Sequence, residues 1–192
     1  VPARSGGQMV SDVCRIRLRG ERQFVSRGGN KLDAAIRTFG VDVAGLRAID
    51  VGSSTGGFTD CLLQHGAKSV ACVDVNYSQL AWSIRQDKRV AVFERTNIKQ
   101  AEPVELGAPF DIIVIDVSFI SLASLADVLA RLARQETILI ALVKPQFESR
   151  HEETVSGVVL DEEVRQRTLE EVCIALRESG FAVIDSMTSP VK

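Results

Sequence analysis

The sequence is poor in the residues that mark metal centres and thiol chemistry. It holds four cysteines, none of them in a C-x-x-C pair. Its only histidines, His65 and His151, are not spaced for a zinc site. We therefore expect no metal, and we expect a Cys–His nucleophile to be absent. The cysteines are predicted to be free thiols of a reducing compartment; they are Cys14, Cys61, Cys72 and Cys173.

Long apolar runs are also missing. No stretch approaches the roughly 18 consecutive apolar residues of a membrane-spanning helix, which excludes such a helix. Residues 1–7 lack the apolar core of a secretory signal. With 45% hydrophobic and 25% charged residues among 192, the composition is that of a globular domain and not of a disordered chain. We expect a cytoplasmic protein that does not enter membranes.

The net charge of −2 hides an uneven distribution of charge along the chain. Residues 1–31 carry seven basic and two acidic side chains, a balance of +5, so the remaining 161 residues carry −7. A basic arm on an acidic body is typical of proteins whose one end meets a polyanion. In that arm, Arg15, Arg17 and Arg19 alternate with apolar residues, which predicts a strand too short to fold alone. The alternative is that these arginines only solvate a short edge strand.

Beyond the arm, short apolar runs alternate with helical segments. The runs predict six strands, over 47–52, 69–75, 89–96, 110–117, 137–143 and 182–187. Helices are predicted over 32–39, 57–65, 79–86, 122–134 and 161–179. The strands are continuously apolar and do not alternate with polar residues. The pattern therefore predicts a doubly wound α/β domain, whose mostly parallel sheet is covered on both faces.

A glycine-rich turn follows the first strand, in the segment Asp50-Val-Gly-Ser-Ser-Thr-Gly-Gly-Phe-Thr59. Such a turn lets the backbone approach a ligand and aims the next helix at it. The spacing G-x-x-x-G-G is neither the dinucleotide fingerprint nor the P-loop, which argues against a dehydrogenase and an NTPase. Asp74 ends the second strand, where a carboxylate can accept ribose hydroxyls, and Asn97 follows the third, where an amide can meet adenine. Together these features favour S-adenosylmethionine; another small ligand in the same fold is the alternative.

Two charged residues, Asp116 and Lys144, directly follow strongly apolar strands. Both are expected at the carboxyl edge of the sheet, where ligands bind in this architecture. A lysine there is a candidate base, and a plain ion pair between two strand ends is the alternative. Before the first helix, Arg27 and Lys31 stand in a segment of small residues, which suits either an anion site or an ordinary capped turn.

Five segments of the chain resemble the TlyA/hemolysin A family of FtsJ-type RNA 2′-O-methyltransferases. They are Phe24-Val-Ser-Arg-Gly-Gly-Asn-Lys-Leu32, Asp50-Val-Gly-Ser-Ser-Thr-Gly-Gly-Phe-Thr-Asp60, Glu94-Arg-Thr-Asn97, Asp116-Val-Ser-Phe-Ile-Ser121 and Leu142-Val-Lys-Pro-Gln-Phe-Glu148, in this order. The resemblance implies the class I methyltransferase fold, S-adenosylmethionine as cofactor, and ribosomal RNA or ribosomal subunits as partners. It also implies that residues 1–23 are the end of an S4-like RNA-binding module with its linker, and residues 24–192 the methyltransferase domain.

The resemblance assigns roles to single residues as well. Lys31, Asp116 and Lys144 match three members of the family's Lys–Asp–Lys–Glu tetrad, whereas Glu148 matches a different segment and is not the fourth. That fourth member follows a Ser-Pro-x-Lys segment, and this chain stops at Ser189-Pro-Val-Lys192. We therefore expect a C-terminal truncation without the last strand, and weak or absent activity. The residues implied to contact the cofactor are Asp50, Gly52, Ser53, Gly56, Gly57, Phe58, Asp74, Asn97 and Asp116. Those implied to contact RNA are Arg15, Arg17, Arg19, Arg27 and Lys31.

Two other functions stay open at this point. One is a nonenzymatic RNA- or nucleoside-binding module with the same fold. The other is a membrane-active hemolysin, as the second family name suggests, although the sequence supplies neither a spanning helix nor a strongly basic amphipathic one. The oligomeric state is left open.

Overall fold

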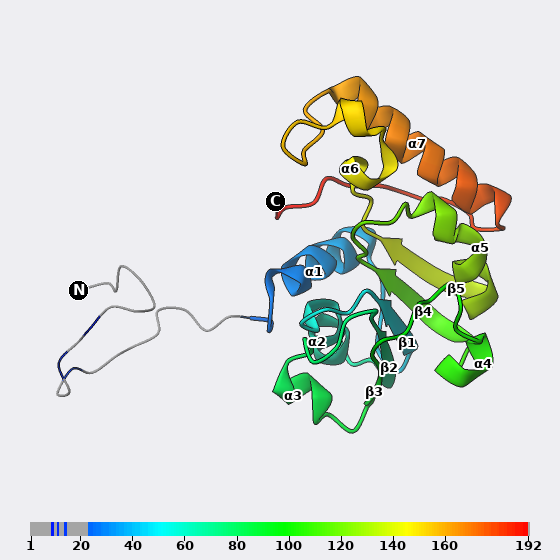
Figure 1. Cartoon of the computed structure of the whole chain (residues 1–192). Helices are drawn as coiled ribbons and strands as arrows, with labels where there is room; N and C mark the ends of the chain where they lie inside the picture. Colours follow the sequence, from blue (N-terminus) through cyan, green and yellow to red (C-terminus); the bar gives the residue numbers. More distant parts are fainter. Residues whose placement is uncertain (1–8, 10, 12–13, 15–22, 192) are drawn as a thin grey trace.

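The computed structural model of the protein describes residues 9, 11, 14 and 23–191. The predicted arm strand with Arg15, Arg17 and Arg19 therefore falls outside the described residues. The domain from residue 23 onward carries the sheet, its helices and the candidate site (Figure 1).

Five strands form one sheet in the order β3-β2-β1-β4-β5, and every neighbouring pair is parallel. The strands are β1 (Arg47–Val51), β2 (Ser69–Val73), β3 (Val90–Phe93), β4 (Phe110–Ile115) and β5 (Ala133–Ala141). The strand order reverses between β1 and β4, and doubly wound proteins bind their ligands at the carboxyl edge of this switch point. The predicted parallel α/β architecture is confirmed.

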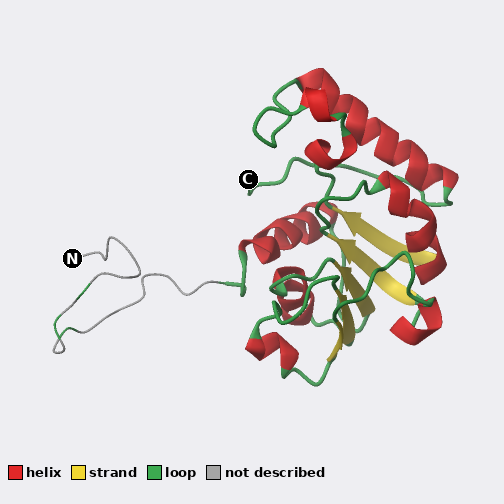
Figure 2. Cartoon of the chain, viewed as in Figure 1, coloured by secondary structure: helices red, strands yellow, loops and turns green. Residues whose placement is uncertain are grey.

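Helices cover both faces of the sheet, which forms the middle layer (Figure 2). One face is covered by α1 (Arg27–Phe39), α2 (Gly57–Gln64) and α3 (Trp82–Arg85), and the other by α4 (Pro103–Leu106), α5 (Ala126–Leu132) and α7 (Glu162–Glu178). Single turns make up η1 (Ala123–Leu125), α6 (Pro145–Glu148) and η2 (His151–Glu153). Within the described ranges, no helix has both the length and the apolar character that crossing a bilayer requires.

Alternate residues of each strand supply two separate cores. Ala48 and Val114 face α1 and α2, whereas Ile49 and Ile113 face α5 and α7. All four are at most 1% exposed, and Ile49 lies opposite Ile113 in the β1–β4 register. Because both faces of the sheet are buried, the strands read as uninterrupted apolar runs.

Residues 182–187, the predicted sixth strand, are extended but pair with no strand of the described chain. Phe181 and Val183 pack against the α5/α7 core, while Ile184 is 88% exposed. The side-chain alternation is therefore real, but a strand also needs a neighbour with which it exchanges backbone hydrogen bonds. The prediction of a strand is wrong for this segment.

Several element boundaries also differ from the sequence prediction, and two of the differences have a clear local cause. Helix α1 begins at Arg27 and not at residue 32, because Ser26 caps it: the Ser26 hydroxyl accepts the Gly28 N–H at 3.3 Å. Strand β5 begins inside the predicted helix 122–134 and contains an irregularity in its register with β4. There the Thr137 hydroxyl accepts the Arg134 N–H and donates to the Phe110 carbonyl, both at 2.7 Å.

The start of α1 is packed closely against the start of α2. A Cβ atom on Gly57 would lie 2.1 Å from the Ser26 hydroxyl oxygen and 2.9 Å from the Gly29 nitrogen. The Asp60 carboxylate of α2 accepts the Val25 N–H at 2.8 Å. Helix α2 therefore fixes where α1 begins, and with it every side chain in the first turns of α1.

We expect G57A to lower the free energy of unfolding by about 1–3 kcal/mol, because the new methyl group would overlap Ser26 and the α1 backbone. G28A is the matched control, since its Cβ would lie 3.3 Å from the same hydroxyl and alanine favours a helix. Urea denaturation of the three proteins measures the effect. A G57A variant as stable as wild type would contradict this account of the α1–α2 contact.

Candidate active site

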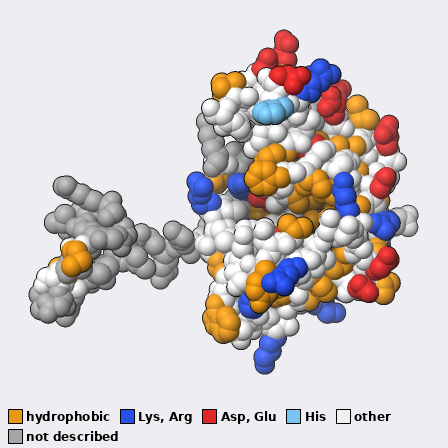
Figure 3. Space-filling view, in the orientation of Figure 1, with side chains coloured by type: hydrophobic (Ala, Val, Ile, Leu, Met, Phe, Trp, Pro, Cys, Tyr) orange, Lys and Arg blue, Asp and Glu red, His pale blue; other side chains and the backbone are white. Residues whose placement is uncertain are grey.

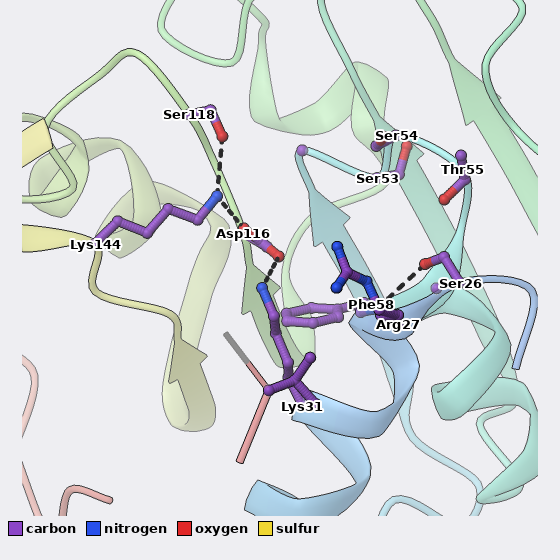
Figure 4. A pocket seen from close by; sticks show the side chains of 14 residues that line it. Ser26, Arg27, Lys31, Ser53, Ser54, Thr55, Phe58, Asp116, Ser118 and Lys144 are labelled. Carbon is purple, nitrogen blue, oxygen red and sulfur yellow. Dashed lines mark hydrogen bonds and ion pairs between the residues drawn. The ribbon is translucent and has the colours of Figure 1, made fainter. Parts of the chain in front are cut away.

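A cavity of about 310 Å³ opens at the carboxyl edge of the sheet, over the switch point between β1 and β4 (Figure 4). Its walls come from the first turns of α1, the glycine-rich turn, and the ends of β4 and β5. The lining residues are Ser26, Arg27, Gly28, Lys31, Gly52, Ser53, Ser54, Thr55, Gly57, Phe58, Asp116, Ser118, Lys144 and Val191.

Lys31, Asp116 and Lys144 meet in this cavity. The Lys144 Nζ atom lies 2.5 Å from Asp116 Oδ1, and the Lys31 Nζ atom lies 3.7 Å from Asp116 Oδ2. The three side chains keep 20–22% of their surface exposed, so they remain accessible to a ligand. A plain Asp–Lys pair between two strand ends does not describe this arrangement, because one carboxylate bridges two amines and the cluster has a net charge of +1.

A fourth polar group, Ser118, belongs to the same cluster. The Lys144 Nζ atom donates a hydrogen bond to the Ser118 hydroxyl at 2.9 Å. Asp116 and Ser118 thus hold the amine from two sides, which fixes the direction in which it points. Sequence reasoning missed Ser118; the only available signal was its place two residues after Asp116.

The glycine-rich turn is in close contact with the end of β4. Gly52 has a φ of 84°, and a Cβ atom on it would lie 2.6 Å from the Asp116 carbonyl oxygen, so no other residue fits there. Of the predicted cofactor contacts in this turn, Gly52, Ser53, Gly57 and Phe58 line the cavity. Gly56 does not; it is the buried N-cap of α2.

Asp50 supports the turn from beneath and has no exposed surface. Its Oδ2 atom accepts the Thr59 N–H at 3.0 Å and the Thr59 hydroxyl at 2.7 Å, while Oδ1 has no hydrogen-bond partner among the described residues. Burial raises the pKa of Asp50 to about 7, against the opposing effect of the Thr59 hydrogen bonds. The geometry therefore gives Asp50 a supporting position beneath the turn, and its expected contact with the cofactor stays a prediction.

Asp74 and Asn97 lie at the ends of β2 and β3, outside the cavity lining. The Asp74 carboxylate accepts the Ser54 N–H at 2.7 Å and the Asn76 N–H at 2.8 Å, so it is tied to the glycine-rich turn and remains partly exposed. The exposed Asn97 accepts the Lys99 N–H at 3.0 Å. For both residues, contact with a cofactor stays a prediction.

The structure describes two of the five residues predicted to contact RNA, Arg27 and Lys31. Arg27 is exposed at the cavity on the first turn of α1, whereas Lys31 lies in the charged cluster. Arg15, Arg17 and Arg19 lie outside the described residues, so their role stays a prediction.

Cysteine chemistry is not supported at the cavity. Burial raises the pKa of the Cys61 thiol to about 12, and Cys61 does not line the cavity. Cys61 does form, with Asp33 and His65, the one group of possible metal ligands in the described ranges, between α1 and α2. There both Asp33 oxygens are already engaged, by His65 and by Arg37, each at 2.8 Å.

Comparison with known proteins gives consistent results. Residues 24–192 match the sequence profile of a family described as FtsJ-like methyltransferases. A TlyA 16S/23S rRNA (cytidine-2′-O)-methyltransferase from Mycobacterium tuberculosis is 41% identical over 194 residues, covering 100% of this chain and 72% of the relative. A solved structure from Streptococcus thermophilus, provisionally named a hemolysin, has a TM-score of 0.87 and 41% identity over 91% of this chain, which spans 64% of that structure. An S-adenosylmethionine dependent methyltransferase from Mesorhizobium loti shares the fold, with a TM-score of 0.58 and 18% identity over 79% of this chain and 81% of its own.

The burial of Asp50 predicts an inverse dependence of stability on pH. Its pKa is about 7 in the fold against 3.8 ordinarily, so the folded protein holds a proton that the unfolded chain has released. This contribution to stability therefore falls as pH rises from about 4 to about 7, by at most roughly 1.4 kcal/mol per pH unit. D50N cannot titrate and should gain stability relative to wild type over that range. Urea denaturation of both proteins at pH 4.5 and 7.5 tests this, and a pH-independent difference would contradict it.

Proposed function

Since the chain belongs to the FtsJ-like methyltransferase family, we propose that it methylates ribose 2′-hydroxyls of ribosomal RNA with S-adenosylmethionine as methyl donor. The observation that carries the proposal is the convergence of two lysines on one aspartate, Asp116, beside the glycine-rich turn. The relative from Mycobacterium tuberculosis supplies the nature of the acceptor, a ribose hydroxyl of rRNA.

The residues around the cavity suit S-adenosylmethionine. The cavity of about 310 Å³ falls in the size range of small-molecule sites. Asp74 receives two backbone N–H groups, and a carboxylate can accept about four hydrogen bonds, so capacity remains for a ribose diol. The turn from Gly52 to Thr55 would hold the amino acid end of the cofactor, near Lys31 and Asp116. When bound, S-adenosylmethionine supplies an activated methyl group on a sulfonium.

The chain's own task is then to orient the ribose hydroxyl and remove its proton. To take the hydroxyl proton as the 2′-oxygen attacks the methyl group, the Lys144 ammonium first releases one proton to solvent, and its Nζ atom then accepts the proton of the hydroxyl. Asp116 and Ser118 hold that atom in place, at 2.5 Å and 2.9 Å. The ammonium of Lys31 stabilises the negative charge that develops on the oxygen. Alignment contributes most to the rate, because the methyl group is already activated.

The charge around the cavity favours a nucleic acid substrate. Its lining carries three cations, Arg27, Lys31 and Lys144, against the single carboxylate of Asp116, a balance of +2. In Figure 3 basic side chains lie beside the start of α1, whereas acidic ones gather at the rim over α7. A local positive field of this kind attracts phosphate groups even though the whole chain carries −2.

Phe119, one residue after the cavity-lining Ser118, is proposed as a surface for a base of the substrate. It is 91% exposed, and its φ of 65° is unusual for a residue with a large side chain. Its ring lies 5.2 Å from that of Phe147, centroid to centroid. An exposed aromatic ring at this position supports the proposal that Phe119 stacks on the base whose ribose enters the cavity.

The N-terminal arm completes the proposed RNA-binding surface. Residues 1–23 are proposed to be the end of an S4-like module, in which Arg15, Arg17 and Arg19 contact phosphates. Their sequence alternation and the charge of +5 over residues 1–31 support this role.

We expect K144A to lower the rate of methyl transfer by about 10²-fold or more, because the group that takes the hydroxyl proton is lost. The assay follows a labelled methyl group into rRNA, and K68A, an exposed lysine at the start of β2, is the control. S-adenosylmethionine affinity should stay within a few-fold. Both variants are made in the full-length protein: wild-type rates in K144A would refute the role of this lysine, and no transfer by the full-length wild-type protein would favour the nonenzymatic binding module.

We expect F119A to raise the KM for RNA by about tenfold or more, because base stacking contributes roughly 1–3 kcal/mol. F119W should restore RNA binding, since it keeps an aromatic face. Cofactor affinity, measured by calorimetry, should not change in either variant. An unchanged KM in F119A would show that this ring does not contact the substrate.

A further inference from the structure

The segments that follow β4 and β5 lie along one another. Residues 116–122 and residues 144–148 are joined by five contacts, each made by a side chain of residues 144–148, and these contacts occur in the same order along both segments. The pairs are Lys144 with Asp116, Lys144 with Ser118, Phe147 with Phe119, and Glu148 with Ser121 and Leu122.

The contacts of Glu148 engage both oxygens of its carboxylate. The Ser121 hydroxyl donates to Glu148 Oε2 at 2.7 Å, and the Leu122 N–H donates to Glu148 Oε1 at 2.6 Å. Leu122 is 1% exposed, so this end of the loop is fixed in the core. No ion pair joins Glu148 to a cation among residues 23–191, and each of its two oxygens accepts a hydrogen bond from the loop. Glu148 therefore acts on the loop and not on the chemistry.

Among the described residues, the middle of the loop, residues 117–120, lacks the backbone hydrogen bonds that hold its two ends. At one end the Asp116 N–H bonds to the Val51 carbonyl at 3.1 Å. In the described part of the chain, the backbone of residues 117–120 makes no hydrogen bond. This stretch carries both Ser118 and Phe119, and Phe119 has the positive φ of 65°. Its conformation depends on side-chain contacts with residues 144–148.

We propose that Glu148 is a positioning residue: it fixes the loop 117–122 against α6, so that Ser118 reaches Lys144 and Phe119 faces the substrate. The inference rests on the proposed function, because it concerns the alignment of the same reaction. A displacement of about 1 Å in such a site can cost on the order of 10²-fold in rate. Glu148 is four residues from Lys144, so it ties the loop to the segment that carries the base.

The test compares E148A with E148Q in the intact protein. A glutamine can accept the Leu122 N–H with its amide oxygen and donate to the Ser121 hydroxyl with its amide nitrogen, so it keeps both contacts without the charge. We expect E148A to lower kcat by about tenfold or more at saturating RNA and cofactor, with unchanged cofactor affinity. E148Q should restore kcat to within a few-fold of wild type. E152A, an exposed carboxylate in η2, is the control.

Hydrogen exchange gives a readout that does not depend on activity. E148A should speed exchange of the Leu122 and Ser124 amides, which donate to Glu148 and to the Ser121 hydroxyl, by about tenfold, and E148Q should not. Wild-type kcat and wild-type exchange in E148A would overturn the inference, as would an E148Q variant as slow as E148A, which would make the charge the active feature. Failure of the full-length wild-type protein to methylate rRNA would instead refute the proposed function, while the exchange measurement would still decide whether Glu148 holds the loop.

A double-mutant cycle with S121A separates positioning from general destabilisation. S121A removes one of the two hydrogen bonds to Glu148. If Glu148 acts through the loop, the effects of E148A and S121A on kcat should be clearly less than additive. Fully additive effects would contradict the inference.

Discussion

Asp116 holds the site together, because its two carboxylate oxygens pair with lysines from distant parts of the chain. Its position is set by the centre of the sheet. Its N–H bonds to the Val51 carbonyl at 3.1 Å, and its own carbonyl lies against Gly52, where a Cβ atom would be 2.6 Å away. Because the backbone of Asp116 is fixed by strand pairing, its carboxylate can hold the two flexible lysine amines in defined positions. A carboxylate on a mobile segment could not do this.

The two lysines reach Asp116 by different routes, and each route has its own structural requirement. Lys144 lies three residues beyond the end of β5, and the parallel pairing of β5 with β4 brings it close. Lys31 comes from α1, which lies outside the sheet and is placed by the close contact of Ser26 with Gly57. Small residues at the α1–α2 contact therefore matter to the chemistry even where they touch no ligand. Under the proposed function, helix packing affects catalysis because the position of α1 determines the position of Lys31.

Much of this arrangement is visible in the sequence, because strands, the glycine-rich turn and charges at strand ends leave local patterns. Continuous apolar runs predicted β1 to β5, and the strand ends predicted that Asp116 and Lys144 share one edge. The failures concern features that depend on partners. Residues 182–187 have the alternation of a strand without a pairing neighbour, and the burial of Asp50 depends on Thr59, nine positions away. The side-chain contacts of Glu148 have no local pattern either.

The site thus consists of two halves that are built differently. The half assigned to the cofactor is held by backbone hydrogen bonds, such as that from the Gly52 N–H to the Val73 carbonyl at 2.8 Å. Its glycine-rich turn lies so close to the end of β4 that Gly52 has no room for a side chain. The half assigned to RNA rests on side-chain contacts between two short loops. A constant small ligand suits the first kind of support. The proposed RNA substrate meets the second kind of support, in which a single carboxylate, that of Glu148, anchors the loop that carries Ser118 and Phe119.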